Sequence, residues 1–193
     1  MNNENRKIIF LFPLLIYLIS ALVGCTSSQE RRILVVHSYE ETYTAYPEFN
    51  RLIAKQFKKE GVNADIRTLY LDCESYKEET ELKRMRYLLD SVSGDWRPEV
   101  ILVNEDQATY SLLKCGDPLV KEVPVVFAGV NYPNWELLKQ YPNATGFHDK
   151  IGFVQNAEMA RKLFGDSVRL FTLLDSTFLD VQIRKDARKQ LAG

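Results

Sequence analysis

The sequence predicts a doubly wound α/β fold built around a parallel sheet. Two short apolar runs, residues 100–103 and 123–127, are rich in β-branched residues, as is usual for strands buried on both faces of such a sheet. The segment between them, residues 108–114, suits a short helix and therefore forms a crossover. Strand patterns alternate with helical patterns along the rest of the chain, which indicates right-handed crossovers throughout.

The first strand is expected at residues 33–36, and a helix follows it from Pro47 to a stop at Gly61. The positions of this helix that follow the helical period, apolar with one polar exception, are Phe49, Leu52, Ile53, Gln56 and Phe57. Residues 66–71 form the next strand. Their alternating pattern places that strand nearer the edge of the sheet.

The longest helix is predicted over residues 75–93, where Ser75 and Glu78 can form a capping box. Its charge run, residues 77–86, is then the solvated face. Its apolar stripe consists of Leu82, Met85, Leu88, Leu89 and Val92. Past residue 133 the expected elements are a short helix at 134–141, a brief strand or turn at 143–149, a helix at 156–164, a sixth strand at 168–174 and a helix at 178–191.

The composition is that of a globular protein with one or two domains. Of the 193 residues, 46% are hydrophobic and 26% are charged, with a net charge of −1. No basic stripe or stacking motif interrupts the acidic residues, so the sequence excludes a nucleic-acid partner.

The first residues are typical of a secretory signal. Arg6 and Lys7 precede an apolar run over residues 8–23, which is the layout of the charged and apolar regions of a signal peptide. The sequence therefore predicts an exported, membrane-anchored protein of the periplasm or cell envelope. Because the apolar run is only slightly shorter than a membrane span, an uncleaved N-terminal anchor is the alternative.

The residues at the end of this run, Leu22-Val23-Gly24-Cys25, resemble the bacterial lipobox. The resemblance implies a signal peptide of residues 1–24, cleavage before Cys25, and lipidation of Cys25. A polar tether over residues 25–31 would then connect the lipid to the folded region.

The other two cysteines are expected to be free thiols. Cys73 follows the second strand at the carboxyl edge of the sheet, whereas Cys115 ends a helix that has run back to the opposite edge. A disulfide needs Cα atoms within about 7 Å of each other. Cys73 and Cys115 should therefore be unpaired and buried.

Polar loops follow the predicted strands and form the candidate binding site. Ligands of open parallel sheets bind beyond the carboxyl ends of the strands, so residues 104–107 and 128–132 should lie together on one edge. The loop after the first strand, residues 37–43, is a second candidate. The predicted ligand-binding residues are Ser38, Tyr39, Glu40, Asn104, Glu105, Asp106, Gly129, Asn131 and Tyr132.

Two pairs of these residues have a structural alternative. Ser38 and Tyr39 either hydrogen-bond a ligand or cap their own loop. Glu105 and Asp106 either hold a ligand's ammonium group through charge-assisted hydrogen bonds or supply capping oxygens and acidic charge to the first turn of a helix. A carboxylate pair of this kind can also serve acid–base chemistry.

Asn131 and Tyr132 can orient a ligand and stack on it, or can form a turn before the following proline. The two tryptophans, Trp96 and Trp135, are expected to be packing residues. Trp135 is close enough to Tyr132 in the chain to contribute to a site as well.

No catalytic, metal or cofactor site is predicted. His37, Ser38 and Glu40 are neighbours on one loop, without the nucleophile elbow of serine hydrolases. His148 with Asp149 makes a poor zinc set because the two histidines of the chain are far apart in sequence. No nucleotide-binding glycine loop is present either. The expectation is a binding protein that is not an enzyme.

Four segments of the chain carry a resemblance to a known superfamily. They are residues 33–39 (ILVVHSY), 104–108 (NEDQA), 124–131 (PVVFAGVN) and 144–147 (ATGF). With these segments the chain resembles the periplasmic-binding-protein-like superfamily, specifically the ABC-transporter substrate-binding family and related sensor regions of bacterial histidine kinases. The third segment is most similar to the sensor branch, whose members usually have an Asp-Asp pair where this chain has Glu105-Asp106.

The resemblance implies two α/β lobes that close on a small molecule. The first lobe, of type I, would span residues 32–150, and residues 151–193 would contain the crossover and the start of a truncated second lobe.

The function implied is the sensory input of a two-component histidine kinase. The alternative is a lipid-anchored substrate-binding protein that delivers a solute to an ABC permease. The implied ligand is an amino acid or a similar small molecule. Apolar residues of the last strand, including Val168, Leu170, Leu173 and Leu174, would lack their normal neighbours.

Overall fold

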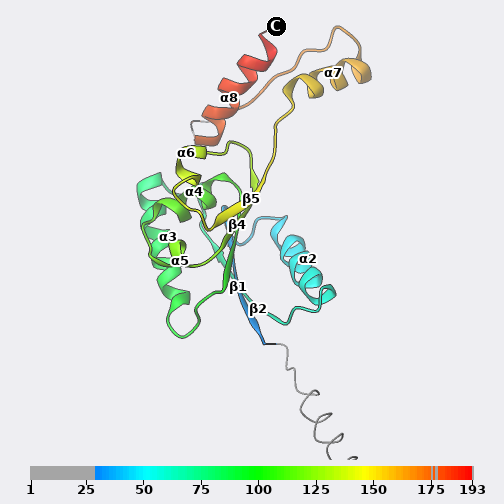
Figure 1. Cartoon of the computed structure of the whole chain (residues 1–193). Helices are drawn as coiled ribbons and strands as arrows, with labels where there is room; N and C mark the ends of the chain where they lie inside the picture. The colour runs from blue at the N-terminus through cyan, green and yellow to red at the C-terminus, as the bar shows by residue number, and fades with distance from the viewer. Residues whose placement is uncertain (1–28, 175, 177, 193) are drawn as a thin grey trace, which may run out of the picture.

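The structure is a computed structural model that describes residues 29–174, 176 and 178–192. The predicted signal peptide, Cys25 and the first part of the tether lie outside these residues. The described chain forms one five-stranded sheet in which all neighbouring strands are parallel, in the order β2-β1-β3-β4-β5 (Figure 1). The strands are β1 (Arg31–His37), β2 (Ala64–Tyr70), β3 (Val100–Asn104), β4 (Val125–Val130) and β5 (Ala144–His148). The predicted α/β class and the edge position of β2 are confirmed.

Helices cover the sheet unequally. In Figure 1, α3, α4 and α5 lie on one side of the sheet and α2 lies on the other, while α7 and α8 lie beyond the carboxyl ends of the strands. The helices are α2 (Tyr46–Lys59), α3 (Glu78–Ser93), α4 (Asp106–Lys114), α5 (Leu119–Glu122), α6 (Trp135–Leu138), α7 (Phe153–Phe164) and α8 (Phe178–Leu191). Helix α5 is not among the elements that the sequence predicted.

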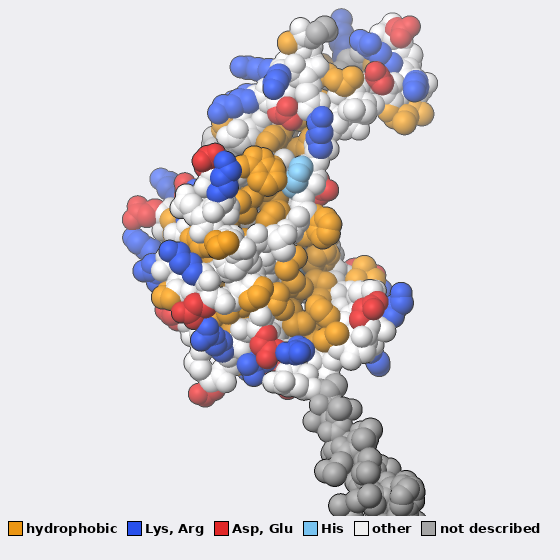
Figure 2. All heavy atoms as spheres, viewed as in Figure 1, with side chains coloured by type: hydrophobic (Ala, Val, Ile, Leu, Met, Phe, Trp, Pro, Cys, Tyr) orange, Lys and Arg blue, Asp and Glu red, His pale blue; other side chains and the backbone are white. Residues whose placement is uncertain are grey.

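The hydrophobic core lies between the sheet and helices α3 and α4. Buried side chains of the strands, such as Ile101 and Val103, pack there with Met85 and Leu89 of α3. Because side chains alternate along a strand, Leu102 points to the α2 face, where it is half-buried. Figure 2 shows hydrophobic side chains gathered on the surface beside α2. The burial on both faces that was expected for residues 100–103 and 123–127 therefore holds only in part, because one face of β3 and of β4 is half-buried, whereas residues 33–37 of β1 are buried on both faces.

Helix α3 begins three residues later than predicted. The Ser75 hydroxyl donates a hydrogen bond to Asp72 Oδ1 at 2.9 Å, within a turn closed by a bond from Ser75 N to Asp72 O at 3.1 Å. Lys77 occupies the N-cap position without a side-chain cap. The predicted capping box of Ser75 and Glu78 is therefore wrong, because Asp72 already holds the serine hydroxyl.

The sixth strand predicted at residues 168–174 is also wrong. This segment has no regular secondary structure, and Figure 1 shows it running beyond the carboxyl edge of the sheet, away from β5. A strand requires a neighbouring strand to complete its hydrogen-bond ladder. The expected exposure of apolar residues is confirmed for Leu170 and Leu173, which are 58% and 99% exposed, whereas Val168 and Leu174 are half-buried.

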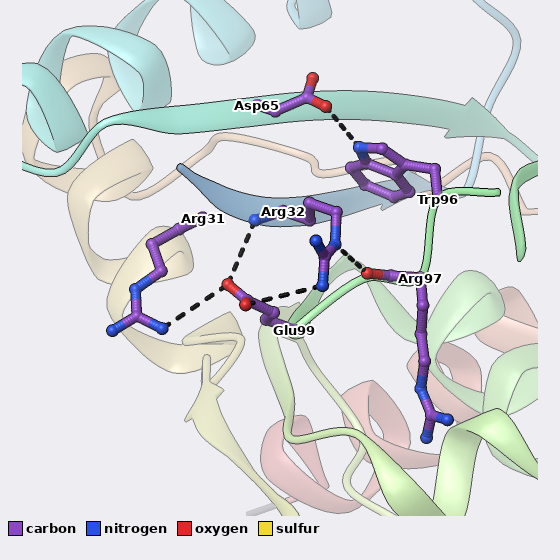
Figure 3. A network of polar contacts seen from close by, with 6 residues as sticks. All are labelled: Arg31, Arg32, Asp65, Trp96, Arg97 and Glu99. Carbon is purple, nitrogen blue, oxygen red and sulfur yellow. Dashed lines mark hydrogen bonds and ion pairs between the residues drawn. The ribbon is translucent and has the colours of Figure 1, made fainter. Parts of the chain in front are cut away.

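A polar network closes the amino edge of the sheet (Figure 3). Glu99 lies 3.7 Å from the guanidinium groups of both Arg31 and Arg32, and Arg32 Nε donates to the carbonyl of Arg97. The indole of Trp96 donates to Asp65 of β2. These contacts hold the loop before β3 against the ends of β1 and β2.

Both predicted free thiols are confirmed, since Cys73 and Cys115 are buried and unpaired. Burial is the main cause that raises the pKa of Cys73 to about 12. Among the described residues, no helix has the length and apolar character needed to cross a bilayer.

Candidate functional site

The carboxyl edge of the sheet brings the candidate loops together. Asn104, at the end of β3, is the register partner of His37 on one side and of Ala128 on the other. The loops that leave β1, β3 and β4 therefore start side by side, as the sequence predicted. The predicted binding residues of all three loops lie on this edge.

Asp106 joins two of these loops. It is the first residue of α4 and is fully buried. Its carboxylate accepts hydrogen bonds from the backbone N–H groups of Asn131 at 2.8 Å and Tyr132 at 3.1 Å, and from the Asn131 side chain at 3.4 Å. The Asp106 carboxylate thus binds the loop after β4. The side chain of Glu105, the N-cap residue of α4, makes no capping hydrogen bond to the helix.

Glu105 makes the turn from β3 into α4 in an unusual backbone conformation, with φ 75° and ψ 170°. Its N–H continues the ladder to the carbonyl of Ala128 at 2.8 Å, and its own carbonyl accepts the first helical bond, from Thr109 N at 3.2 Å. A non-glycine residue with positive φ is strained, and such residues gather at functional sites. The sharp turn places the Glu105 side chain between the loops after β1 and β4.

The Glu105 carboxylate accepts a hydrogen bond from the Tyr46 hydroxyl at 3.0 Å. Burial is the main cause that raises the pKa of Glu105, and the neighbouring Asp106 adds to it. Gly129 lies against this side chain with φ +68°, so that an added Cβ would sit 3.2 Å from Asn104 Oδ1 and 3.5 Å from Glu105 Cγ. Glycine at position 129 therefore allows the two loops to approach closely.

Ser38 connects the loop after β1 to the start of α4. Its hydroxyl donates to the carbonyl of Asn104 at 3.0 Å and accepts from the N–H of Ala108 at 2.9 Å, and the residue is fully buried. Ser38 therefore has a structural role, but it links its loop to Asn104 and to the first turn of α4 and does not cap its own loop as the structural alternative proposed. Glu40 and Tyr39 are half-buried on the same loop.

Aromatic side chains pack around the loop after β1. His37 lies at the centre of this cluster, and the sequence analysis did not include it among the predicted binding residues. The ring of His37 stacks on Tyr46 with centroids 3.9 Å apart, and Tyr39 lies 4.8 Å from Tyr43. His37 is fully buried, and burial lowers its pKa against the opposing effect of a 2.8 Å hydrogen bond between Nε2 and Asn50 Oδ1. The signal available in the sequence was a histidine at the very end of a buried apolar strand.

Asn131 and Tyr132 line a hollow of about 350 Å³ at the carboxyl edge. The other lining residues, several of them from α8, are Lys150, Ile151, Gln182, Lys185, Asp186 and Lys189. The Tyr132 hydroxyl is buried and lies beside the carboxylate of Asp186 in α8. Burial first, and then the charge of Asp186, raise the pKa of Tyr132. The hollow thus offers an amide, a hydroxyl, a carboxylate and several cationic groups to a ligand.

Two other sequence expectations concern residues outside this hollow. Trp96 is buried as expected, whereas Trp135 is 53% exposed with its ring edge-on to His148 at 5.6 Å, so the packing role predicted for Trp135 is wrong. Over residues 29–174, 176 and 178–192, no group of His, Cys, Asp and Glu side chains is arranged to hold a metal ion.

Comparison with solved structures shows that the chain shares its α/β fold with other proteins, one of them a substrate-binding protein. The chain is similar to a conserved domain protein from Vibrio cholerae O1 biovar El Tor, with a TM-score of 0.64 and 16% identity over 84% of this chain. It is also similar to the ligand-free, open form of a substrate-binding protein with adhesive properties from Clostridium difficile, with a TM-score of 0.53 and 13% identity over 84% of this chain. In both comparisons the match covers 53% of the other chain, so this chain spans about half the length of these structures. No protein-family model and no curated protein matches the sequence.

Proposed function

We propose that the chain binds a small molecule at the carboxyl edge of its sheet and serves as the extracytoplasmic sensory input of a two-component histidine kinase. The observation that carries the binding proposal is the link from Asp106 to the backbone of Asn131 and Tyr132. It holds the loop after β4 in place while Asn131 and Tyr132 line an open hollow of about 350 Å³. A volume of this size suits a small organic ligand.

In this proposal the site residues divide into two groups. Asn131 and Tyr132 contact the ligand through an amide and a hydroxyl, and Tyr39 and Glu105 lie on neighbouring loops of the same edge of the sheet. The residues that shape the site without contacting the ligand are Ser38, Asp106 and Gly129. The ligand is an amino acid or a similar small polar molecule, and binding would act by favouring one arrangement of the protein over another.

The sensory role is supported by the run at residues 124–131, PVVFAGVN, which resembles the sensor branch of the superfamily. A second candidate is a lipid-anchored substrate-binding protein of an ABC transporter. Two observations favour it: the lipobox-like residues before Cys25, and the structural similarity to a substrate-binding protein. A kinase region encoded downstream in the same reading frame would support the first candidate, and adjacent permease and ATPase genes would support the second.

The proposal includes export to the cell envelope and the absence of catalysis by this region. Mass spectrometry of the mature N-terminus tests the anchor, since an intact Met1 would contradict cleavage before Cys25. Turnover of esters that is lost in Ser38→Ala would contradict the non-enzymatic role. The buried Ser38 hydroxyl and its two bonds within the protein argue against its action as a nucleophile.

Isothermal titration of the full-length protein with a panel of amino acids tests the binding site. At least one member should give saturable heat, and Asn131→Ala and Tyr132→Phe should each weaken its binding about five-fold or more, as the loss of one hydrogen bond does. Tyr87→Phe, a change at a tyrosine of α3 that is 72% exposed, is the matched control and should bind like the wild type. Absence of heat with every member, or equal binding by all variants, would refute the site.

A further inference from the structure

A second cavity lies between α3 and α4, and none of its lining residues lines the hollow described above. Its volume is about 410 Å³, within the range of small-molecule sites. The lining residues used in the argument below come from the loop after β2 and from the two helices. They are Cys73, Tyr76, Glu81, Gln107, Ser111 and Lys114.

The polar centre of this cavity is the carboxyl group of Glu81. The sequence places Glu81 within the charge run expected to face solvent, yet Glu81 is only 7% exposed. Among the described residues, its hydrogen-bond partner is Ser111, whose hydroxyl donates to Glu81 Oε2 at a long 3.3 Å. Burial raises the pKa of Glu81. A buried acid with one long hydrogen bond lacks the compensation that burial of a charge normally requires.

A second acceptor lies on the facing helix. Gln107 lines the same cavity, and its buried side-chain Oε1 has no hydrogen-bond partner within the described part of the chain. Buried polar atoms in native proteins are nearly always satisfied, so an unsatisfied acceptor needs an explanation. Glu81 and Gln107 both call for a group that donates hydrogen bonds.

Two lysines line the cavity, Lys77 and Lys114, and in the described part of the chain neither donates a hydrogen bond to Glu81 or to Gln107 Oε1. The charge of Lys114 acts on Glu81 without such a bond. Lys114 lines the cavity but donates to Glu78 at 2.6 Å, at the exposed end of the wall. The guanidinium carbon of Arg84 lies 4.4 Å from the centroid of the Tyr76 ring, and Arg84 Nε donates a hydrogen bond to the carbonyl of Leu71. The apolar surface of Tyr76 and Cys73 faces the same space as the two acceptors.

We propose that the cavity between α3 and α4 is a binding site for a small organic amine, separate from the site at Asn131 and Tyr132. The ammonium group donates charge-assisted hydrogen bonds to Glu81 and Gln107. The apolar part of the ligand lies against Tyr76 and Cys73. This assignment goes beyond the proposed function, because it uses none of the residues of that site.

NMR titration of the full-length, ¹⁵N-labelled protein with phenethylamine tests the proposal. Two analogues of similar shape, 2-phenylethanol and 3-phenylpropionate, replace the ammonium group with a hydroxyl and with a carboxylate. We expect phenethylamine to shift the amide signals of Glu81 and Ser111 in a saturable manner and to leave those of Asn131 and Tyr132 unchanged. The two analogues should bind at least ten-fold more weakly.

Variants identify the group responsible. Glu81→Gln should weaken phenethylamine binding at least ten-fold, whereas Glu79→Gln, an exposed residue of the same helix that pairs with Lys83, should bind like the wild type. Tyr76→Ala changes a wall residue that is 38% exposed and provides a second test if Glu81→Gln does not fold. The proposal is overturned by absence of saturation, by equal binding of 2-phenylethanol, by shifts at Asn131 in place of Glu81, or by unchanged affinity in the folded variants.

Discussion

The carboxylate of Asp106 lies 2.8 Å from the backbone nitrogen of Asn131, so the first residue of α4 holds the loop that leaves the neighbouring strand, β4. A buried carboxylate that accepts backbone N–H groups makes strong, charge-assisted hydrogen bonds. The relative position of the two loops is therefore fixed by the protein itself. A ligand at this edge would meet a site whose loops are already in place.

Asp106→Asn should destabilise the protein by about 1.5–3 kcal/mol, because a side-chain amide has a single oxygen to accept the two backbone N–H groups that the carboxylate now binds. Chemical denaturation measures the loss, and hydrogen exchange should show reduced protection of the Asn131 and Tyr132 amides. Asp90→Asn, on the exposed side of α3, is the control and should be neutral. If both amides keep their protection in Asp106→Asn, the link does not hold the loop.

Glu105→Gly should be more stable than Glu105→Ala by about 1–2 kcal/mol, since glycine adopts positive φ without the strain that a Cβ brings. Both variants lose the same contact with Tyr46, so the difference between their free energies of unfolding reports the backbone strain at position 105. The same pair of changes at Asp90, inside α3, should give the opposite order, with glycine about 0.5–1 kcal/mol worse than alanine. Equal stability of the two Glu105 variants would mean that the turn is not strained.

Gly146→Ala should destabilise the protein by about 3 kcal/mol, at the upper end of the usual cost of overpacking. A Cβ at this position of β5 would lie 2.0 Å from the carbonyl oxygen of Phe127 and 2.6 Å from its ring. The clash with backbone cannot be relieved by rotating a side chain. Gly94→Ala, where a Cβ meets nothing within 4 Å, is the matched control. A Gly146→Ala protein as stable as Gly94→Ala would contradict the close pairing of β4 and β5.

The position of the candidate site could be predicted from the sequence. Apolar runs identified the strands, and the carboxyl ends of parallel strands lie at one edge of a sheet, so the loops that follow them were expected to meet. Asn104 and Ala128 are neighbours for this reason. The use of the Asp106 carboxylate was not predictable, because helix capping, ligand binding and a bond to a distant loop all suit the same residue type.

The wrong predictions of secondary structure concern segments in which the local sequence pattern did not determine the contacts that form. Ser75 fits a capping box, but Asp72 binds its hydroxyl first. Residues 168–174 have the composition of a strand, yet a strand also needs a neighbour with which to pair. Helix α5, residues 119–122, is too short for a helical period to appear in the sequence.

The buried imidazole of His37 should make stability depend on pH. Burial lowers the pKa of His37 in the folded protein below its usual value of 6.5, because Tyr46, Phe49 and Tyr70 surround the ring. As pH falls, the unfolded chain therefore binds a proton before the folded protein does. The contribution of neutral His37 to stability is complete above about pH 6.5 and declines below it, at up to about 1.4 kcal/mol per pH unit.

His37→Phe keeps an aromatic ring against Tyr46 and removes the titrating group, at the loss of the hydrogen bond to Asn50. Urea denaturation of both proteins at several pH values between 7.5 and about 5 measures the difference in their free energies of unfolding. The advantage of the wild type should be constant above pH 6.5 and should shrink as the solution becomes more acidic, because His37→Phe has no proton to bind at this position. An advantage that stays constant down to pH 5 would show that His37 is protonated as easily in the folded protein as in the unfolded chain.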